Sequence, residues 1–152
     1  MSSIDKIHEI NNFLNQHVPL FQAMEAKLER CDETVLAIAA PLEPNINDKG
    51  IAFGGSMAAI AALTGWAVTR ITLDEHNETA EIVIADSTLK FLRPLRDSIV
   101  AECLRPDTAT AQQFIDNLRQ RGKVRWSLDV IIHADGEPAM TFTGRYGVYR
   151  PT

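Results

Sequence analysis

Cysteine is scarce in this sequence, and the two residues present, Cys31 and Cys103, lie outside any CxxC or Cys/His spacing. Such placement does not indicate a zinc site or a disulfide framework, so we expect two reduced thiols, a cytoplasmic protein and no metal. The N-terminal segment has early acidic residues and lacks the apolar stretch of a signal peptide, which agrees with that location.

Basic charge is also in short supply. The formal net charge is -5 and the pI is near 5.3. A chain with this balance has no overall attraction for nucleic-acid phosphates or for an anionic membrane surface, so we expect no nucleic acid and no membrane among its partners. We expect no cofactor either.

Neither repeats nor low-complexity linkers interrupt the 152 residues, of which 45% are hydrophobic and 23% charged. This length and composition are typical of one globular domain with a sizeable core. We expect residues 1–18 to form an N-terminal helix and residues 19–152 to form a single domain.

One uncharged run extends over nineteen residues, from Ile51 to Thr69. Its length satisfies the rule for a membrane span of roughly 18 residues, but its alanines and glycines make the transfer into lipid unfavourable compared with a leucine-rich span. On a helical period, the small residues Gly55, Ala62 and Gly65 share one side, and larger apolar residues take another. We therefore predict a helix that a sheet encloses, with a small-residue side that lets a backbone or a ligand approach closely.

The remaining elements follow from periodicity and from turn residues. Alternation predicts strands over residues 24–30, 34–42, 81–92, 98–105, 124–134 and 138–149. Ser2 or Ser3 is expected to cap a first helix, and Asp107 or Thr108 a later helix that stops at Gly122. Asp135-Gly136 predicts a type I′ hairpin. The class is therefore α+β, an antiparallel β-sheet of about six strands wrapped around a long central helix, whose open edges favour a dimer joined edge to edge.

Several of these residues form a familiar pattern. Asn47, Gly50 and Phe53-Gly54-Gly55, followed by DSTLKFLRP, resemble the hotdog-fold thioesterase superfamily from about Pro19 to Val148. The pattern NxN, FGGS and LTGW is more similar still to the thioesterase-like domain that some bacteria carry fused to GNAT acetyltransferases, here expected to stand alone. The resemblance implies the hotdog fold and a bacterial acyl-CoA or acyl-carrier-protein thioesterase. It also implies a substrate tunnel at the interface of a homodimer or a dimer of dimers.

The Phe-Gly-Gly turn is the first candidate for chemistry. Amides at the start of a helix are unsatisfied and carry the positive end of the helix dipole, so Gly54 and Gly55 are candidates for an oxyanion hole. The alternative is that two glycines only form a tight turn and let the helix pack closely. Ser56, which follows them without a GxSxG elbow, is better explained as a helix cap than as a nucleophile.

The resemblance also shows which catalytic groups are missing. Asn47 matches the asparagine that positions substrate or water in related hydrolases. Their acidic residue falls on Ala62, and their turn histidine on Phe53, which we assign to substrate binding instead. A methyl group neither activates water nor attacks a carbonyl, so the usual catalytic pair is incomplete.

Two polar residues are candidates to compensate. Thr64 lies on another side of the helix, and its alternative role is a hydrogen bond to the Ile60 carbonyl. Asp86 is in phase with Ile82 and Ile84 on an apolar strand face, where a carboxylate is catalytic, ion-paired or displaced by a bulge.

Coenzyme A would bring phosphates that need cations. Lys90, Arg93 and Arg96 surround the Phe-Leu-Arg-Pro turn, and a second group follows the later helix: Arg119, Arg121, Lys123 and Arg125. The alternative for most of these residues is a solvated face, and Lys90 and Arg93 are assigned to substrate binding, with Arg93 the first choice. Acyl-thioester hydrolysis is the leading hypothesis. A noncatalytic acyl-CoA or acyl-carrier binding module is the alternative, and a dehydratase or isomerase ranks last because no histidine lies near the turn.

Overall fold

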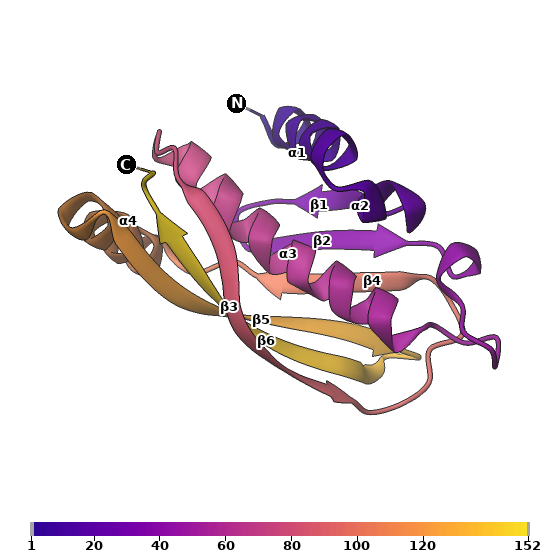
Figure 1. Ribbon diagram of the computed structural model, residues 1–152. Coiled ribbons are helices and arrows are strands. Elements are labelled where there is room, and N and C mark those ends of the chain that lie inside the picture. The colour runs from indigo at the N-terminus through magenta and orange to yellow at the C-terminus, as the bar shows by residue number, and fades with distance from the viewer. Residues whose placement is uncertain (1, 152) are drawn as a thin grey trace.

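The computed structural model describes residues 2–151, which form one antiparallel sheet and a long helix that crosses its face (Figure 1). The helices are α1 (Ser3–His17), α2 (Pro19–Ala23), α3 (Gly54–Glu75) and α4 (Thr108–Arg121), with a 3-10 turn at Glu43–Asn45. The strands are β1 (Lys27–Cys31), β2 (Val35–Ala40), β3 (Glu81–Phe91), β4 (Ile99–Leu104), β5 (Lys123–Ala134) and β6 (Glu137–Tyr149).

The sheet has six strands in the order β1-β2-β4-β5-β6-β3, and each neighbouring pair is antiparallel. This arrangement confirms the predicted α+β class and the predicted enclosure of the central helix. Strands β1 and β3 form the two edges. The position of β3 matters for function because it leaves one long strand without a neighbour on its outer side.

Local signals set the ends of several elements where the sequence predicted them. Ser2 caps α1 in a reciprocal capping box with Asp5. Asp107 caps α4, and Gly122 ends it in the left-handed conformation at φ 73°. Asp135 and Gly136, at φ 52° and 77°, form the two-residue turn between β5 and β6.

The segment before β1 departs from the prediction. Pro19 opens the short helix α2, which ends at Ala23 with Met24 as its C-cap, and Glu25 then takes a positive φ of 54°. Strand β1 therefore begins at Lys27 instead of residue 24, although Met24 is buried and Glu25 exposed as the alternation predicted. Helix α1 lies against this strand, because the Asn11 side chain bonds both the N–H and the carbonyl of Leu28.

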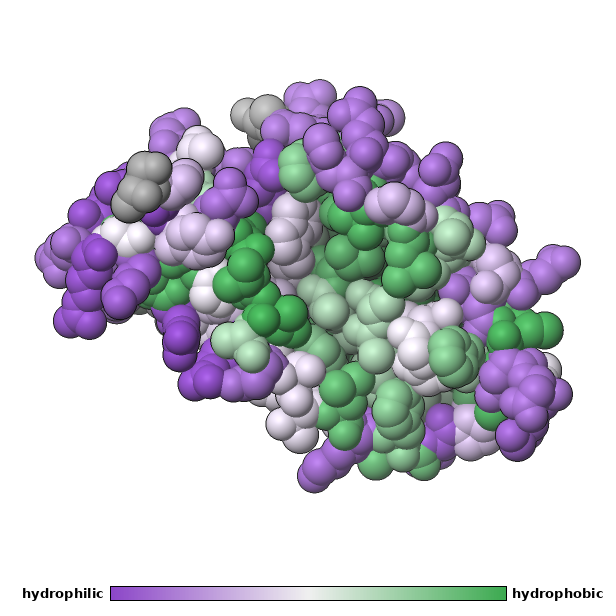
Figure 2. All heavy atoms as spheres, viewed as in Figure 1, coloured by the Kyte–Doolittle hydropathy of each residue, from purple (hydrophilic) through white to green (hydrophobic). Residues whose placement is uncertain are grey.

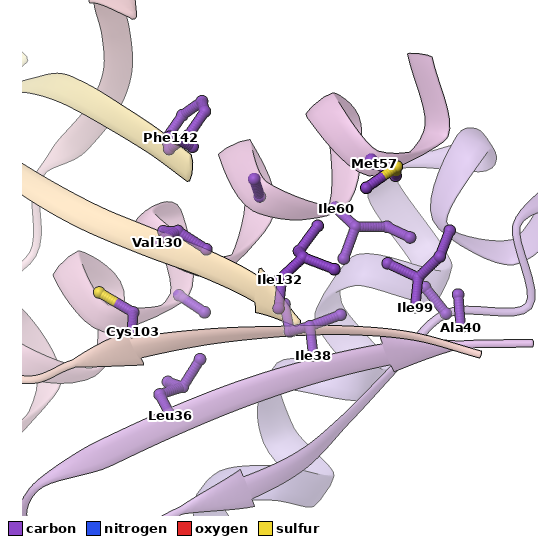
Figure 3. Close-up of a cluster of buried hydrophobic side chains, with 14 of the residues drawn as sticks. Leu36, Ile38, Ala40, Met57, Ile60, Ile99, Cys103, Val130, Ile132 and Phe142 are labelled. Atoms are coloured by element: carbon purple, nitrogen blue, oxygen red, sulfur yellow. The ribbon is translucent and has the colours of Figure 1, made fainter. Parts of the chain in front are cut away.

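The core lies between α3 and the sheet. Figure 3 shows Met57 and Ile60 of α3 facing Ile38, Ile99 and Ile132, which come from three adjacent strands. In length and composition α3 qualifies as a membrane span, but 61% of its most apolar window is buried inside the fold. Helix α3 is therefore the enclosed core helix that the uncharged run predicted.

A tyrosine makes the close approach that the small residues of α3 allow. Tyr146 of β6 is 1% exposed, and its hydroxyl donates a hydrogen bond of 2.7 Å to the Ala62 carbonyl. A Cβ on Gly65 would lie 2.2 Å from the Tyr146 oxygen, so only glycine fits at this position of the helix. Burial raises the pKa of the Tyr146 hydroxyl, which therefore stays a hydrogen-bond donor.

Candidate functional site

The N-terminus of α3 is free of a side-chain cap. Phe53 is the N-cap residue, and no described side chain accepts a hydrogen bond from the first turn. Ser56, which the sequence suggested as the cap, lies inside the helix at its third residue, so that interpretation was wrong. The N–H groups of Gly54 and Gly55 are thus left for another acceptor, at the positive end of a helix of 22 residues.

Asn45 fixes the position of this helix start. It is 2% exposed, and its side-chain amide donates to the carbonyls of Met24 and Pro41 at 2.9 and 2.8 Å. The backbone carbonyl of Asn45 accepts from the Phe53 N–H at 2.8 Å. Sequence reasoning missed this role because an asparagine in a loop looks like any turn residue. Its only signal was the Asn-x-Asn pair.

Asn47, the predicted positioning residue, organises the next turn. Its Oδ1 accepts from the backbone N–H groups of Lys49 and Ile51 at 2.8 and 3.3 Å. Gly50 closes the turn at φ 74°. The oxygen is therefore occupied, and the Nδ2 group is the part of Asn47 that remains for a ligand.

Two aromatic rings border the glycine amides. A Cβ on Gly54 would lie 3.2 Å from the ring of Phe91, and one on Gly55 would lie 2.4 Å from the ring of Phe53. Both rings are more than half exposed. The glycines thus let an aromatic wall from the loop and another from β3 stand beside the exposed amides.

An apolar surface continues from these rings along α3. Figure 2 shows it hollowed between α1 and β3, over the exposed side of α3. Its far end is a pocket of 220 Å³ lined by Phe13, Leu63, Trp66 and Ile82 among others. Phe13 stacks on Trp66 with ring centroids 5.5 Å apart, and the Arg70 guanidinium lies 4.7 Å from the Phe13 centroid. We call this surface the apolar groove.

Ala62 and Thr64, the two other candidate positions on α3, carry no free polar group. Ala62 is half-buried, and its carbonyl accepts the Tyr146 hydroxyl. Thr64 is fully buried, and its hydroxyl donates to the Ile60 carbonyl at 2.7 Å, as the alternative interpretation predicted. The structure places Thr64 in the core and not beside the glycine amides.

Asp86 lies on the other face of the sheet. The register between β3 and β6 shifts between Ile84 and Asp86, so Ile84 pairs with the buried Tyr146, whereas Asp86 pairs with the exposed Arg145. Cross-strand partners project from one face, so this bulge moves Asp86 away from α3. Its carboxylate forms an ion pair with Arg145. Of the alternatives that the sequence left open for Asp86, the structure therefore shows the bulge and the ion pair.

The predicted phosphate-binding residues lie at the end of β3. Lys90 pairs with Thr141 in the sheet and is exposed. The Arg93 Nε donates to the Pro138 carbonyl at 3.0 Å, which holds this segment against the β5–β6 hairpin. Neither side chain lines the 220 Å³ pocket at the far end of the apolar groove.

Charged residues dominate a second cavity, at the opposite end of α3. This pocket of 640 Å³ is lined by Lys6 and four carboxylates, of which Glu75 binds both Lys6 and Arg105. These ion pairs explain the lowered pKa of Glu75, against the opposing effect of its burial. Within residues 2–151, no cluster of three or more His, Cys, Asp and Glu residues is placed to hold a metal ion.

Comparison with known proteins identifies the family. The family model described as "Putative thioesterase (yiiD_Cterm)" matches residues 7–150. The chain belongs to this thioesterase family. A crystal structure of a "putative thioesterase" from Shewanella oneidensis has 28% identity and a TM-score of 0.86, over 97% of this chain and 99% of that one.

Two further structures resemble this thioesterase-family chain. A protein of unknown function from Chlorobaculum tepidum has 31% identity and a TM-score of 0.92, over 95% of this chain and 94% of that one. A protein described as a "Probable Thioesterase" from Pseudomonas aeruginosa shares the fold at 21% identity and a TM-score of 0.81, over 93% and 94% of the two chains. With these neighbours, the sheet around α3 is the hotdog fold, as the resemblance implied.

Proposed function

We propose that this protein hydrolyses an acyl thioester whose carbonyl lies at the start of α3 and whose acyl chain follows the apolar groove. The observation that carries the proposal is the uncapped amide pair of Gly54 and Gly55 at the mouth of that groove. A polar site at the end of an apolar channel matches a substrate with one reactive carbonyl and an apolar tail.

The chemistry follows from where charge develops. When water attacks the thioester carbon, negative charge builds on the carbonyl oxygen, and fixed N–H donors stabilise it without reorganisation. The Asn47 amide orients the substrate or the water. The leaving group is a thiol with a pKa of about 8.5, so it departs as a thiolate with little need for a general acid. Because no strong general acid is needed, the reaction is compatible with a site where Phe53 replaces histidine.

The proposed active form is a dimer joined through β3. This edge strand exposes Val83 and Ile84, at 48% and 44%, and Phe91 at 57%. A long apolar edge strand is prone to aggregation unless another strand pairs with it, and a second copy would do so across a two-fold axis. Such pairing would also cover the β3 side of the apolar groove. A dimer of dimers and a cytoplasmic location remain predictions.

A noncatalytic acyl-binding module is the second candidate. The observation that favours it is Ala62, which brings a methyl group where related hydrolases carry an acid, together with the placement of Asp86 on the opposite face. A protein of this kind would bind the thioester at the same amides and release it unchanged.

Thiol release separates these functions. Purified protein is incubated with short, medium, long and aromatic acyl-CoAs, and Asn47→Ala is compared with Asn12→Ala, which changes an exposed asparagine on α1. Turnover that Asn47→Ala reduces and Asn12→Ala retains supports hydrolysis. Acyl-CoA binding in calorimetry without thiol release from any ester would instead support the binding module.

A further inference from the structure

Helix α1 reaches α3 at the far end of the apolar groove. The ring of Phe13, on α1, stacks on Trp66 of α3 with centroids 5.5 Å apart and planes inclined by 14°. The Arg70 guanidinium lies 4.7 Å from the Phe13 centroid and 5.9 Å from the Trp66 centroid. The two rings and the arginine thus form one packed group across the end of the groove. We call Phe13, Trp66 and Arg70 the aromatic stop.

The docking of α1 on the sheet does not depend on Phe13. Ile10 and Leu14 of α1 are each 1% exposed and belong to the core. The Asn11 side chain bonds both the N–H and the carbonyl of Leu28. Phe13, in contrast, is only half-buried although its side chain is large and apolar. An aromatic ring that borders a hollow and keeps one side open is available to an apolar ligand.

The side of α3 that faces the groove changes from small to large residues along one row. Gly54, Ala58, Ala62 and Trp66 follow one another at intervals of four residues, and each is half-buried. Residues with this spacing lie one above the other on the same side of a helix. A chain that starts at the Gly54 amide would therefore pass over two alanines before it meets an indole. The alanines keep the groove open, and Trp66 ends it.

The pocket at this end favours an apolar terminus. Its lining includes Leu63 of α3 and Ile82 of β3, and its charged residues are Arg70 and Glu81. Arg70 is already paired with Asp74, whose two carboxylate oxygens each lie 3.2 Å from the Arg70 Nε. An acyl chain that ends in a carboxylate would bring a further negative charge beside Glu81. A chain that ends in a methyl group would instead bury it against apolar side chains.

We propose that the aromatic stop fixes the length of the acyl chain, and that the ligand is an unbranched chain with a methyl end that spans from the Gly54 amide to Trp66. Trp66 lies about 18 Å beyond Gly54 along the helix axis, at about 1.5 Å per residue. An extended chain advances about 1.25 Å per carbon, from bonds of about 1.5 Å, so about ten to fourteen carbons reach the stop once the thickness of the rings is subtracted. The inference rests on the proposed function, because it places the acyl carbonyl at the start of α3.

A stop of this kind has a signature in the dependence of rate on chain length. Each methylene that moves from water into the apolar groove should raise kcat/KM about fourfold, because its burial favours the bound state by that factor. A carbon beyond the stop would collide with the rings or stay in water, so the gain ends there. A plot of log kcat/KM against carbon number should therefore rise and then break at about ten to fourteen carbons.

The test compares the full chain with two variants of α1, on saturated acyl-CoAs from acetyl to stearoyl. Phe13→Ala removes one ring of the aromatic stop, while the core contacts that dock α1 remain. Ile4→Ala is the matched control, because it removes an apolar side chain from the same helix at a position that is 67% exposed. The esters are kept below the concentrations at which they form micelles, and urea unfolding checks that each variant is folded.

We expect the break to move to longer chains in Phe13→Ala, with kcat/KM for the palmitoyl ester raised about tenfold relative to the dodecanoyl ester. In Ile4→Ala the break should stay where the wild type has it. A break outside the expected range, a break that Phe13→Ala leaves unchanged, or a rise that continues to stearoyl-CoA in the wild type would overturn the aromatic stop while hydrolysis still supports the proposed function.

If no ester releases its thiol, the same series is measured as dissociation constants by calorimetry. A break in affinity that Phe13→Ala moves to longer chains would support the aromatic stop and reject hydrolysis. Affinity that does not depend on chain length, or no binding of any ester, would reject both.

Discussion

Gly65→Ala tests how α3 is positioned on the sheet. The added Cβ would lie 2.2 Å from the Tyr146 oxygen and 2.5 Å from the ring carbon that carries it. Tyr146 is 1% exposed and its hydroxyl is bound to the Ala62 carbonyl, so the ring cannot move aside without losing core contacts or this hydrogen bond. The substitution must therefore push the tyrosine and α3 apart.

The size of the effect is a balance of opposing contributions. Alanine gains about 1 kcal/mol over glycine in a helix interior. Overpacking costs about 1–3 kcal/mol, and separating the Tyr146 hydroxyl from the Ala62 carbonyl leaves a buried donor without its partner, at about 1–3 kcal/mol. We expect the free energy of unfolding to fall by about 3 kcal/mol.

Urea unfolding at one fixed protein concentration measures this change, because dimerisation would make stability depend on concentration. Gly147→Ala is the matched control, since its Cβ makes only ordinary contacts and should alter the free energy of unfolding by less than about 0.5 kcal/mol. A Gly65→Ala protein as stable as the control would refute the contact between Tyr146 and α3.

Three further outcomes are expected. Burial raises the pKa of Cys103 from 9.0 to about 12 and also raises the pKa of Tyr146 from 10.0, so both groups ionise first in the unfolded chain. The free energy of unfolding should therefore fall by about 1.4 kcal/mol per pH unit for each group, above pH 9.0 for Cys103 and above pH 10.0 for Tyr146, and Cys103→Ala should make the decline in urea titrations shallower. Ile84→Asp puts a charge on the exposed β3 edge, so sedimentation should show a monomer for the variant and the proposed dimer for the wild type, and a dimeric variant would argue against that edge. Ala62→Asp restores an acid near the groove and should increase thiol release, whereas Ala62→Asn should not; equal rates would mean that no base is missing there.

Much of the fold was predicted from short-range sequence signals at the ends of helices and strands. The caps at Ser2 and Asp107, the glycine stop at Gly122 and the Asp135-Gly136 turn each depend on residues within one turn of the chain. Helix α2 was missed because it spans five residues and is held by the buried ring of Phe21, which is a tertiary contact that no short-range period reveals.

The candidate site was less predictable because its geometry depends on distant partners. The bulge that turns Asp86 outward is defined by the register with β6, and an alternating sequence does not show where one residue is inserted. Tyr146 and Gly65 are far apart in the chain, so the small-residue side of α3 predicted a close approach without identifying what approaches.

Gly54→Pro tests whether the amides at the start of α3 stabilise the reacting thioester. Gly54 is the first helical residue, where proline is favoured, and Phe53 before it has φ -71° and ψ 130°, which a following proline accepts. Gly54→Pro therefore removes one N–H with little change to the helix. Gly54→Ala brings a Cβ to the same place beside Phe91 and keeps the N–H.

The measurement is thiol release from the best acyl-CoA substrate by these two variants. We predict a kcat about 10²-fold to 10³-fold lower for Gly54→Pro than for Gly54→Ala, with both proteins folded. Equal rates for proline and alanine would contradict the role of the amide.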